Sequence, residues 1–161
     1  MSQSFSPLRK FVSPEIIFGA GCRHNVANYA KTFGARKVLV VSDPGVIAAG
    51  WVADVEASLQ AQGIDYCLYS AVSPNPRVEE VMLGAEIYRQ NHCDVIVAVG
   101  GGSPMDCGKA IGIVVAHGRS ILEFEGVDMI RVPSPPLILI PTTAGTSADV
   151  SQFVIISNQQ E

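Results

Sequence analysis

The chain has 161 residues, of which 48% are apolar and 16% charged, and its formal net charge is −4. This length is enough for one domain with a buried core, and the composition excludes a disordered chain. No Lys/Arg-rich run is present, which argues against nucleic-acid binding. No apolar run is long enough for a membrane span, and residues 1–15 lack the apolar core of a signal peptide. We therefore expect a cytoplasmic protein that binds neither nucleic acid nor membrane.

Four cysteines, Cys22, Cys67, Cys93 and Cys107, are far apart and form no CxxC pair. This spacing argues against a zinc knuckle and against a disulfide framework. We expect the four thiols to be reduced and to lie in or near the core.

The first half of the chain predicts strands that alternate with helices. Residues 15–19 ("EIIFG") are typical of a short strand, and residues 24–34 of a helix that ends at a glycine. Residues 37–41 ("KVLVV") form a continuous β-branched run that predicts a buried strand, and the turn signal "SDPG" follows it. Apolar residues at steps of four then predict one amphipathic helix over residues 47–63.

The second half continues the same alternation. Its predicted elements are strands at 65–70, 94–99 and 137–140 and helices at 78–88 and 105–117. The last apolar run, "FVIIS" at 153–157, is interpreted as the start of a β-ribbon. The alternation predicts βαβ crossovers and an α/β fold with a doubly wound, mostly parallel, Rossmann-like sheet flanked by helices.

Ligands bind such sheets at the carboxyl ends of the strands, so the residues directly after each strand are the informative ones. Asp43 follows the first buried strand, where a carboxylate accepts hydrogen bonds from a ribose and repels a 2′-phosphate; a turn residue is the alternative. Asn75, between two prolines, is either a ligand contact or a turn residue. The hydroxyls of the "PTTAGT" segment suit ribose or phosphate, or simply cap the backbone. These hydroxyls belong to Thr142, Thr143 and Thr146.

The segment "VGGGSPMDCGKA" predicts a phosphate cradle. Gly100–Gly102 lack Cβ atoms and let a ligand approach the backbone closely. Ser103 suits a helix N-cap, Pro104 the first helical position, and Asp106 a variant of the capping box. Such a helix start directs free N–H groups and a positive dipole end at the loop. The spacing fits neither GxGxxG nor Walker A, and turn chemistry alone is the alternative reading of the glycines.

Together the segments "FGAG", "VLVVSD", "PNP", "VGGGSPMDCGKAI" and "PTTAGTSADV" resemble, in this order, the iron-containing (group III) alcohol dehydrogenases. The resemblance covers essentially the whole chain. It implies that residues 1–161 are an N-terminal α/β domain that binds a dinucleotide. It also implies a helical C-terminal domain that binds a divalent metal and is absent from this chain.

The resemblance also implies roles for single residues. Gly101, Gly102 and Ser103 match the residues that hold a pyrophosphate, and Asp43 matches the position that favours NAD over NADP. The other expected cofactor-binding residues are Asn75, Asp106, Thr142, Thr143 and Thr146.

No metal site is expected within residues 1–161. The three histidines, His24, His92 and His117, are widely spaced and form no ligand set. The resemblance implies that a divalent metal, with iron the expected ion, is bound only through the missing domain. No catalytic residue is expected in this chain.

The function that these inferences favour is hydride transfer between a small alcohol or aldehyde and NAD in a full-length, homo-oligomeric dehydrogenase. We expect the isolated chain to be inactive. Two alternatives stay open at this point. One is a stand-alone, non-catalytic nucleotide-binding or interaction module. The other is a zinc-dependent relative similar to glycerol dehydrogenase or dehydroquinate synthase, which belong to the same wider superfamily.

Overall fold

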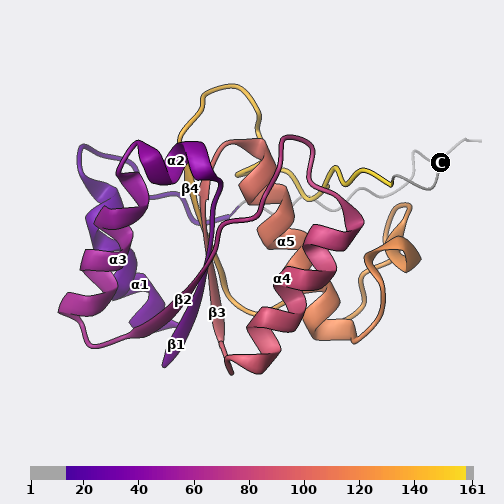
Figure 1. Ribbon diagram of the computed structural model, residues 1–161, viewed down its shortest axis with the longest axis horizontal. Helices are drawn as coiled ribbons and strands as arrows, with labels where there is room; N and C mark the ends of the chain where they lie inside the picture. Colours follow the sequence, from indigo (N-terminus) through magenta and orange to yellow (C-terminus); the bar gives the residue numbers. More distant parts are fainter. Residues whose placement is uncertain (1–13, 159–161) are drawn as a thin grey trace, which may run out of the picture.

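A single parallel sheet forms the centre of the computed structural model, which describes residues 14–158. The strands lie in the order β2-β1-β3-β4, so β2 and β4 are the edges (Figure 1). Their bounds are Lys37–Val41 (β1), Asp65–Tyr69 (β2), Val95–Gly100 (β3) and Leu137–Pro141 (β4). The predicted parallel, doubly wound fold is confirmed.

Helices cover both faces of the sheet (Figure 1). The α-helices are Val26–Thr32 (α1), Pro44–Ala48 (α2), Trp51–Ala61 (α3), Val78–Gln90 (α4) and Gly102–His117 (α5). Two 3-10 helices are Cys22–Asn25 (η1) and Ile121–Phe124 (η2). Alternate side chains of β1 divide between the two faces: Val38 and Val40 pack toward α1 and α3, and Leu39 and Val41 toward α4 and α5.

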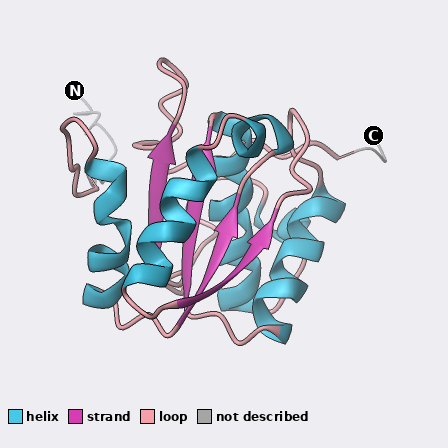
Figure 2. Cartoon of the chain, turned by 60° about the vertical axis from the view of Figure 1, so that its left-hand side comes forward, coloured by secondary structure: helices cyan, strands magenta, loops and turns pink. Residues whose placement is uncertain are grey.

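The chain reverses its winding direction between β1 and β3. From β1 the chain runs through α2 and α3 to β2, and α4 then returns it across β1 to β3. The loops after β1 and β3 therefore diverge at one place, at the end of the sheet where all four strands finish (Figure 2). In open α/β sheets this switch point is the usual ligand crevice.

Ser42 links the strand ends that border this crevice. Its backbone N–H donates to the carbonyl of Tyr69 at 2.9 Å, and its hydroxyl donates to the carbonyl of Val99 at 2.8 Å. The side chain is fully buried, so both hydrogen bonds are shielded from water. The end of β1 is thereby held to the ends of β2 and β3.

Two predicted strands are wrong. Residues 15–19 have no strand assignment, and Ile16 and Phe18 are 64% and 99% exposed. In residues 153–157 the pairing is limited to one isolated bridge, between Ser157 and Arg77. Both segments have the right apolar pattern, but a strand also needs a neighbouring backbone to satisfy its N–H and C=O groups. The described residues supply no such neighbour to residues 15–19, and to residues 153–157 they supply one only at Ser157.

The predicted helix over residues 47–63 is two helices, α2 and α3. Gly50 stands between them with a φ of +83°, a left-handed conformation that ends one helix before the next begins. The steps of four continue across this break in the sequence. The pattern alone therefore gives no sign of the interruption.

Helix α5 begins at Gly102, three residues before the predicted start, and the predicted capping is wrong. Gly101, with extended backbone, is the N-cap, and no side chain caps the helix. Ser103 is instead occupied by the backbone of another loop. Asp106 makes no capping box. Pro104 is the third residue of the helix, which is still in the first turn, where a missing N–H costs nothing.

Candidate cofactor-binding site

The glycine loop after β3 packs directly on the threonine loop after β4. The backbone N–H of Thr142 donates to the carbonyl of Gly100 at 2.9 Å. A Cβ atom placed on Gly101 would lie only 3.1 Å from Oγ1 of Thr143. Real Cβ atoms rarely come that close, so a side chain at position 101 requires Thr143 to shift by a few tenths of an ångström.

Two further contacts extend this surface. A Cβ on Gly102 would touch Cβ of Thr146 at 3.5 Å, an ordinary van der Waals distance. On the other side, the backbone N–H of Asn75 donates to Oγ of Ser103 at 3.3 Å. Asn75 has a φ of +57°, which asparagine tolerates better than most residues. The structure thus brings the predicted residues from three separate loops together.

Glu80, on the first turn of α4, shapes the turn that carries Asn75. Its carboxylate accepts hydrogen bonds from the backbone N–H groups of Ser73 (3.3 Å) and Arg77 (3.1 Å) and pairs with the Arg77 guanidinium at 3.0 Å. Burial raises the pKa of Glu80, but the hydrogen bonds from Ser73 and Arg77 outweigh it and hold the pKa below its usual value. Glu80 is a supporting residue that the sequence reasoning missed.

Asp43 lies at the end of β1, on the other side of the switch point. Its Oδ1 accepts the backbone N–H of Val46 at 3.0 Å, so the side chain is the N-cap of α2. Within residues 14–158, no donor is assigned to Oδ2. Oδ1 therefore caps the helix, and Oδ2 is available to a ligand.

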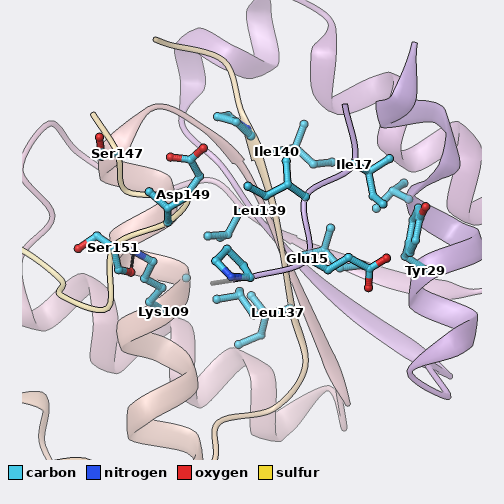
Figure 3. Close-up of a pocket in the computed structure, with 18 of the residues that line it drawn as sticks. Glu15, Ile17, Tyr29, Lys109, Leu137, Leu139, Ile140, Ser147, Asp149 and Ser151 are labelled. Atoms are coloured by element: carbon cyan, nitrogen blue, oxygen red, sulfur yellow. Dashed lines mark hydrogen bonds between the residues drawn. The ribbon is translucent and has the colours of Figure 1, made fainter. Parts of the chain in front are cut away.

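Asp106 points to a different segment. Its Oδ2 accepts the backbone N–H of Ile155 at 3.2 Å, and its Oδ1 lies 3.5 Å from Nζ of Lys109. Lys109 in turn donates to the carbonyl of Ser151 at 3.0 Å, and Figure 3 shows the two side by side. Burial lowers the pKa of Lys109, and the Asp106 carboxylate opposes that effect. Sequence reasoning missed Lys109, although it is the only Lys or Arg in α5 and follows Asp106 at helical spacing.

A cavity of about 1180 Å³ lies along the free edge of β4. It is bounded by residues 14–19 on one side and residues 147–152 on the other (Figure 3). Of the predicted cofactor residues, only Thr142 and Thr143 line it. The cavity is therefore a neighbour of the glycine-loop surface and is distinct from it.

The described residues offer no metal centre. Within residues 14–158, no three side chains of His, Cys, Asp or Glu come close enough to hold an ion. His117 is occupied by backbone groups: its Nδ1 lies 2.9 Å from the carbonyl of Ile113, and its Nε2 accepts the N–H groups of Arg131 and Val132. None of the described helices is long and apolar enough to cross a membrane.

Comparison with known proteins gives consistent matches. The family described as iron-containing alcohol dehydrogenase matches residues 13–161. Alcohol dehydrogenase 4 from Schizosaccharomyces pombe is 40% identical over 159 residues, which cover 98% of this chain and 38% of the relative. The chain thus spans about two fifths of the length of the curated relatives that it matches.

Solved structures agree with the fold. A 1,3-propanediol oxidoreductase matches with a TM-score of 0.91 and 33% identity, over 96% of this chain and 41% of that one. Sulfoacetaldehyde reductase from Bifidobacterium kashiwanohense, solved in complex with NAD+, matches with a TM-score of 0.84 and 31% identity, over the same shares.

Proposed function

We propose, since this chain belongs to the iron-containing alcohol dehydrogenase family, that residues 1–161 are the cofactor-binding domain of an NAD-dependent alcohol dehydrogenase. The observation that carries the proposal is the surface formed by the Gly100–Gly102 loop and the Thr142–Thr146 loop. This surface lies at the carboxyl end of a parallel sheet, beside its switch point.

The pyrophosphate of NAD binds at the start of α5. The backbone at Gly101 and Gly102 has no side chain to hold a phosphate away, and the first N–H groups of a helix have no partner inside it. Ser103 contributes its hydroxyl, which accepts from Asn75 and still has a proton to donate. Asn75 itself forms the wall of the site opposite the threonines.

The adenosine ribose binds at Asp43. The free oxygen of its carboxylate accepts the ribose hydroxyls, and its charge repels the 2′-phosphate of NADP. The second loop lines the remaining wall: the Thr143 hydroxyl faces Gly101, the side chain of Thr146 packs on Gly102, and the backbone of Thr142 bonds to Gly100. Asp106 contributes indirectly, because it orients Lys109 and holds the backbone at Ile155.

Bound NAD supplies the hydride acceptor, and the residues of this chain bind and orient it. The described residues hold no cluster for the family's metal, so we derive no step through a metal from this chain. We propose that a helical domain outside residues 1–161 binds the metal and a small alcohol or aldehyde. The exposed apolar side chains of Phe18 (99%) and Ile155 (73%) support a covering domain or a second copy in a cytoplasmic homo-oligomer.

The substitution Gly101→Val tests the proposed pyrophosphate site. Its side chain would push Thr143 away, so we expect at least tenfold weaker NAD+ binding by calorimetry, with an unchanged circular dichroism spectrum. The control is Ala57→Val, which places the same valine side chain on the exposed side of α3 and leaves binding unchanged. A folded Gly101→Val protein with wild-type affinity would refute this site.

A further inference from the structure

Two cysteines form a close thiol pair away from the candidate cofactor site. Cys67 lies on the edge strand β2, and Cys93 lies in the connection between α4 and β3. Their sulfur atoms are 3.4 Å apart, although 26 positions separate them in the sequence. Both belong to the side-chain cluster on the face covered by α4 and α5. Cys93 precedes β3, whereas the glycine loop follows it.

We propose that Cys67 and Cys93 form a reversible disulfide when the protein meets hydrogen peroxide, with Cys67 as the attacking sulfur and Cys93 as the resolving one. A disulfide joins its sulfurs at about 2.05 Å. The two atoms therefore need to approach by only about 1.4 Å from their present distance.

The surroundings divide the roles between the two thiols. Cys67 is partly exposed on the edge strand, so a small oxidant reaches it, whereas Cys93 is 7% exposed. The hydrogen bond between the two thiols holds the pKa of Cys67 below its usual value; burial opposes this shift and the ammonium of Lys37 supports it. The same hydrogen bond and burial raise the pKa of Cys93; its other ionisable neighbours are Lys37, which opposes the shift, Asp94 and Tyr88. Cys67 therefore carries the thiolate.

The reaction balances in two steps. The Cys67 thiolate attacks one oxygen of hydrogen peroxide, the O–O bond breaks, and the leaving hydroxide becomes water with the proton that the Cys67 thiol released to solvent. The product is a sulfenic acid on Cys67. The Cys93 sulfur then attacks the Cys67 sulfur, and the hydroxyl group leaves as water with the Cys93 proton. Two thiols lose two electrons in total, and one peroxide becomes two waters. A dithiol reductant reverses the bond by exchange.

The other two cysteines serve as internal controls. Cys107 is fully buried in α5, and burial raises its pKa to about 12, so it stays an unreactive thiol. Cys22 is partly exposed, as Cys67 is, but it has no sulfur partner among residues 14–158. Exposure alone therefore predicts similar oxidation of Cys22 and Cys67, whereas the proposal predicts a bond only between Cys67 and Cys93.

The bond would join the edge strand β2 to the start of β3 and close a loop that contains α4. Closing that loop restricts the unfolded chain, so the oxidised protein should resist unfolding better than the reduced one. The glycine loop lies at the opposite end of β3, and we expect the affinity for NAD+ to be unaffected.

The test is peptide mapping of the folded, purified protein after treatment with a stoichiometric amount of hydrogen peroxide. Free thiols are alkylated, the protein is digested without reductant, and the peptides are identified by mass. We expect one linked peptide pair, Cys67 with Cys93, about 2 Da lighter than the two reduced peptides, and its loss after dithiothreitol. Cys22 and Cys107 should be recovered alkylated. An unlinked Cys67–Cys93 pair, or oxidation mainly at Cys22, would overturn the proposal.

Variants separate the two roles. In Cys93→Ser, Cys67 should still react with peroxide and accumulate as a sulfenic acid that dimedone labels. In Cys67→Ser, Cys93 should stay reduced at the same peroxide concentration, and Cys22→Ser should behave as wild type. Equal dimedone labelling of the wild type and Cys93→Ser would contradict a resolving role for Cys93. The mapping of the wild-type protein needs no variant, so the proposal remains testable if one of these does not fold.

Discussion

The centre of the sheet and its β4 edge have similar sequences but different environments. Every residue of β3 is buried, and so are Val38–Val41 of β1. The "LILI" residues of β4 are as apolar, yet all four are only partly buried. An apolar run thus predicts a strand in both places, but it does not tell how many neighbours the strand has.

Of the two wrongly predicted strands, residues 15–19 lie beside this same edge, whereas only Val154 of residues 153–157 does. Residues 15–19 and residues of the 150–154 segment line the cavity along β4. Several apolar side chains of these segments are exposed in the described part of the molecule, namely Ile16, Phe18, Phe153 and Ile155, whereas Val154 and Ile156 pack against the core. The glycine loop differs, because its contacts to the Thr142–Thr146 loop and to Asn75 are all made among described residues. The loops at the switch point are therefore packed against one another, whereas the β4 edge exposes apolar groups.

The largest expected effect compares one leucine from each region. Leu39→Ala removes a fully buried side chain from β1 and should cost about 2–5 kcal/mol of unfolding free energy. Leu139→Ala, on the partly exposed β4, should cost about 1–2 kcal/mol, because less apolar surface is lost. Urea unfolding of the two variants and the wild type measures both values. Equal losses would show that the β4 edge is as well packed as the centre.

The second prediction concerns Asp43, at the switch point. Asp43→Asn keeps an oxygen that caps α2 but removes the charge that repels a 2′-phosphate. We expect NADP+ to gain about tenfold relative to NAD+, equivalent to roughly 1.4 kcal/mol, in parallel calorimetric titrations. Asp65→Asn, on the exposed start of β2, is the control and should leave the ratio unchanged. The same ratio in Asp43→Asn and the wild type would contradict a ribose contact here.

The smallest effect concerns Glu80, which supports the Asn75 turn. Its folded-state pKa lies below the unfolded value of about 4.3. Its stabilising contribution is therefore fully present above that value and is lost as the pH falls through the folded-state pKa. We expect the stability difference between the wild type and Glu80→Gln, in urea, to be largest near pH 6 and to shrink toward pH 3. Its exposed neighbour provides the control: Glu79→Gln should show no such pH dependence.

The alternation of strands and helices in the core and most of the candidate site follow from local sequence patterns. The β-branched runs predict β1 and β3, and the residues after them indicate Asp43 and the glycine loop. The capping of α5 was predicted wrongly, because Ser103 is engaged by Asn75, a residue 28 positions away. Lys109 was missed for the same reason, because it donates to the carbonyl of Ser151, 42 positions away. Glu80 accepts from Ser73 and Arg77, which lie only seven and three positions before it, so this local signal was overlooked. Local patterns predict the helices and strands, whereas the roles of Ser103 and Lys109 depend on hydrogen bonds to residues far away in the sequence.

The central claim is that NAD+ binds at the switch point, and the most direct test is to map the residues that it contacts. A titration of the ¹⁵N-labelled protein with NAD+, followed by two-dimensional NMR, reads both regions at once and tolerates weak binding. We predict the largest shift changes at the amides of Asp43, Asn75, Gly101–Ser103 and Thr142–Thr146, with small changes at Ile16–Phe18 and Leu137. The largest changes along β4 and residues 15–19, with an unaffected glycine loop, would contradict the account.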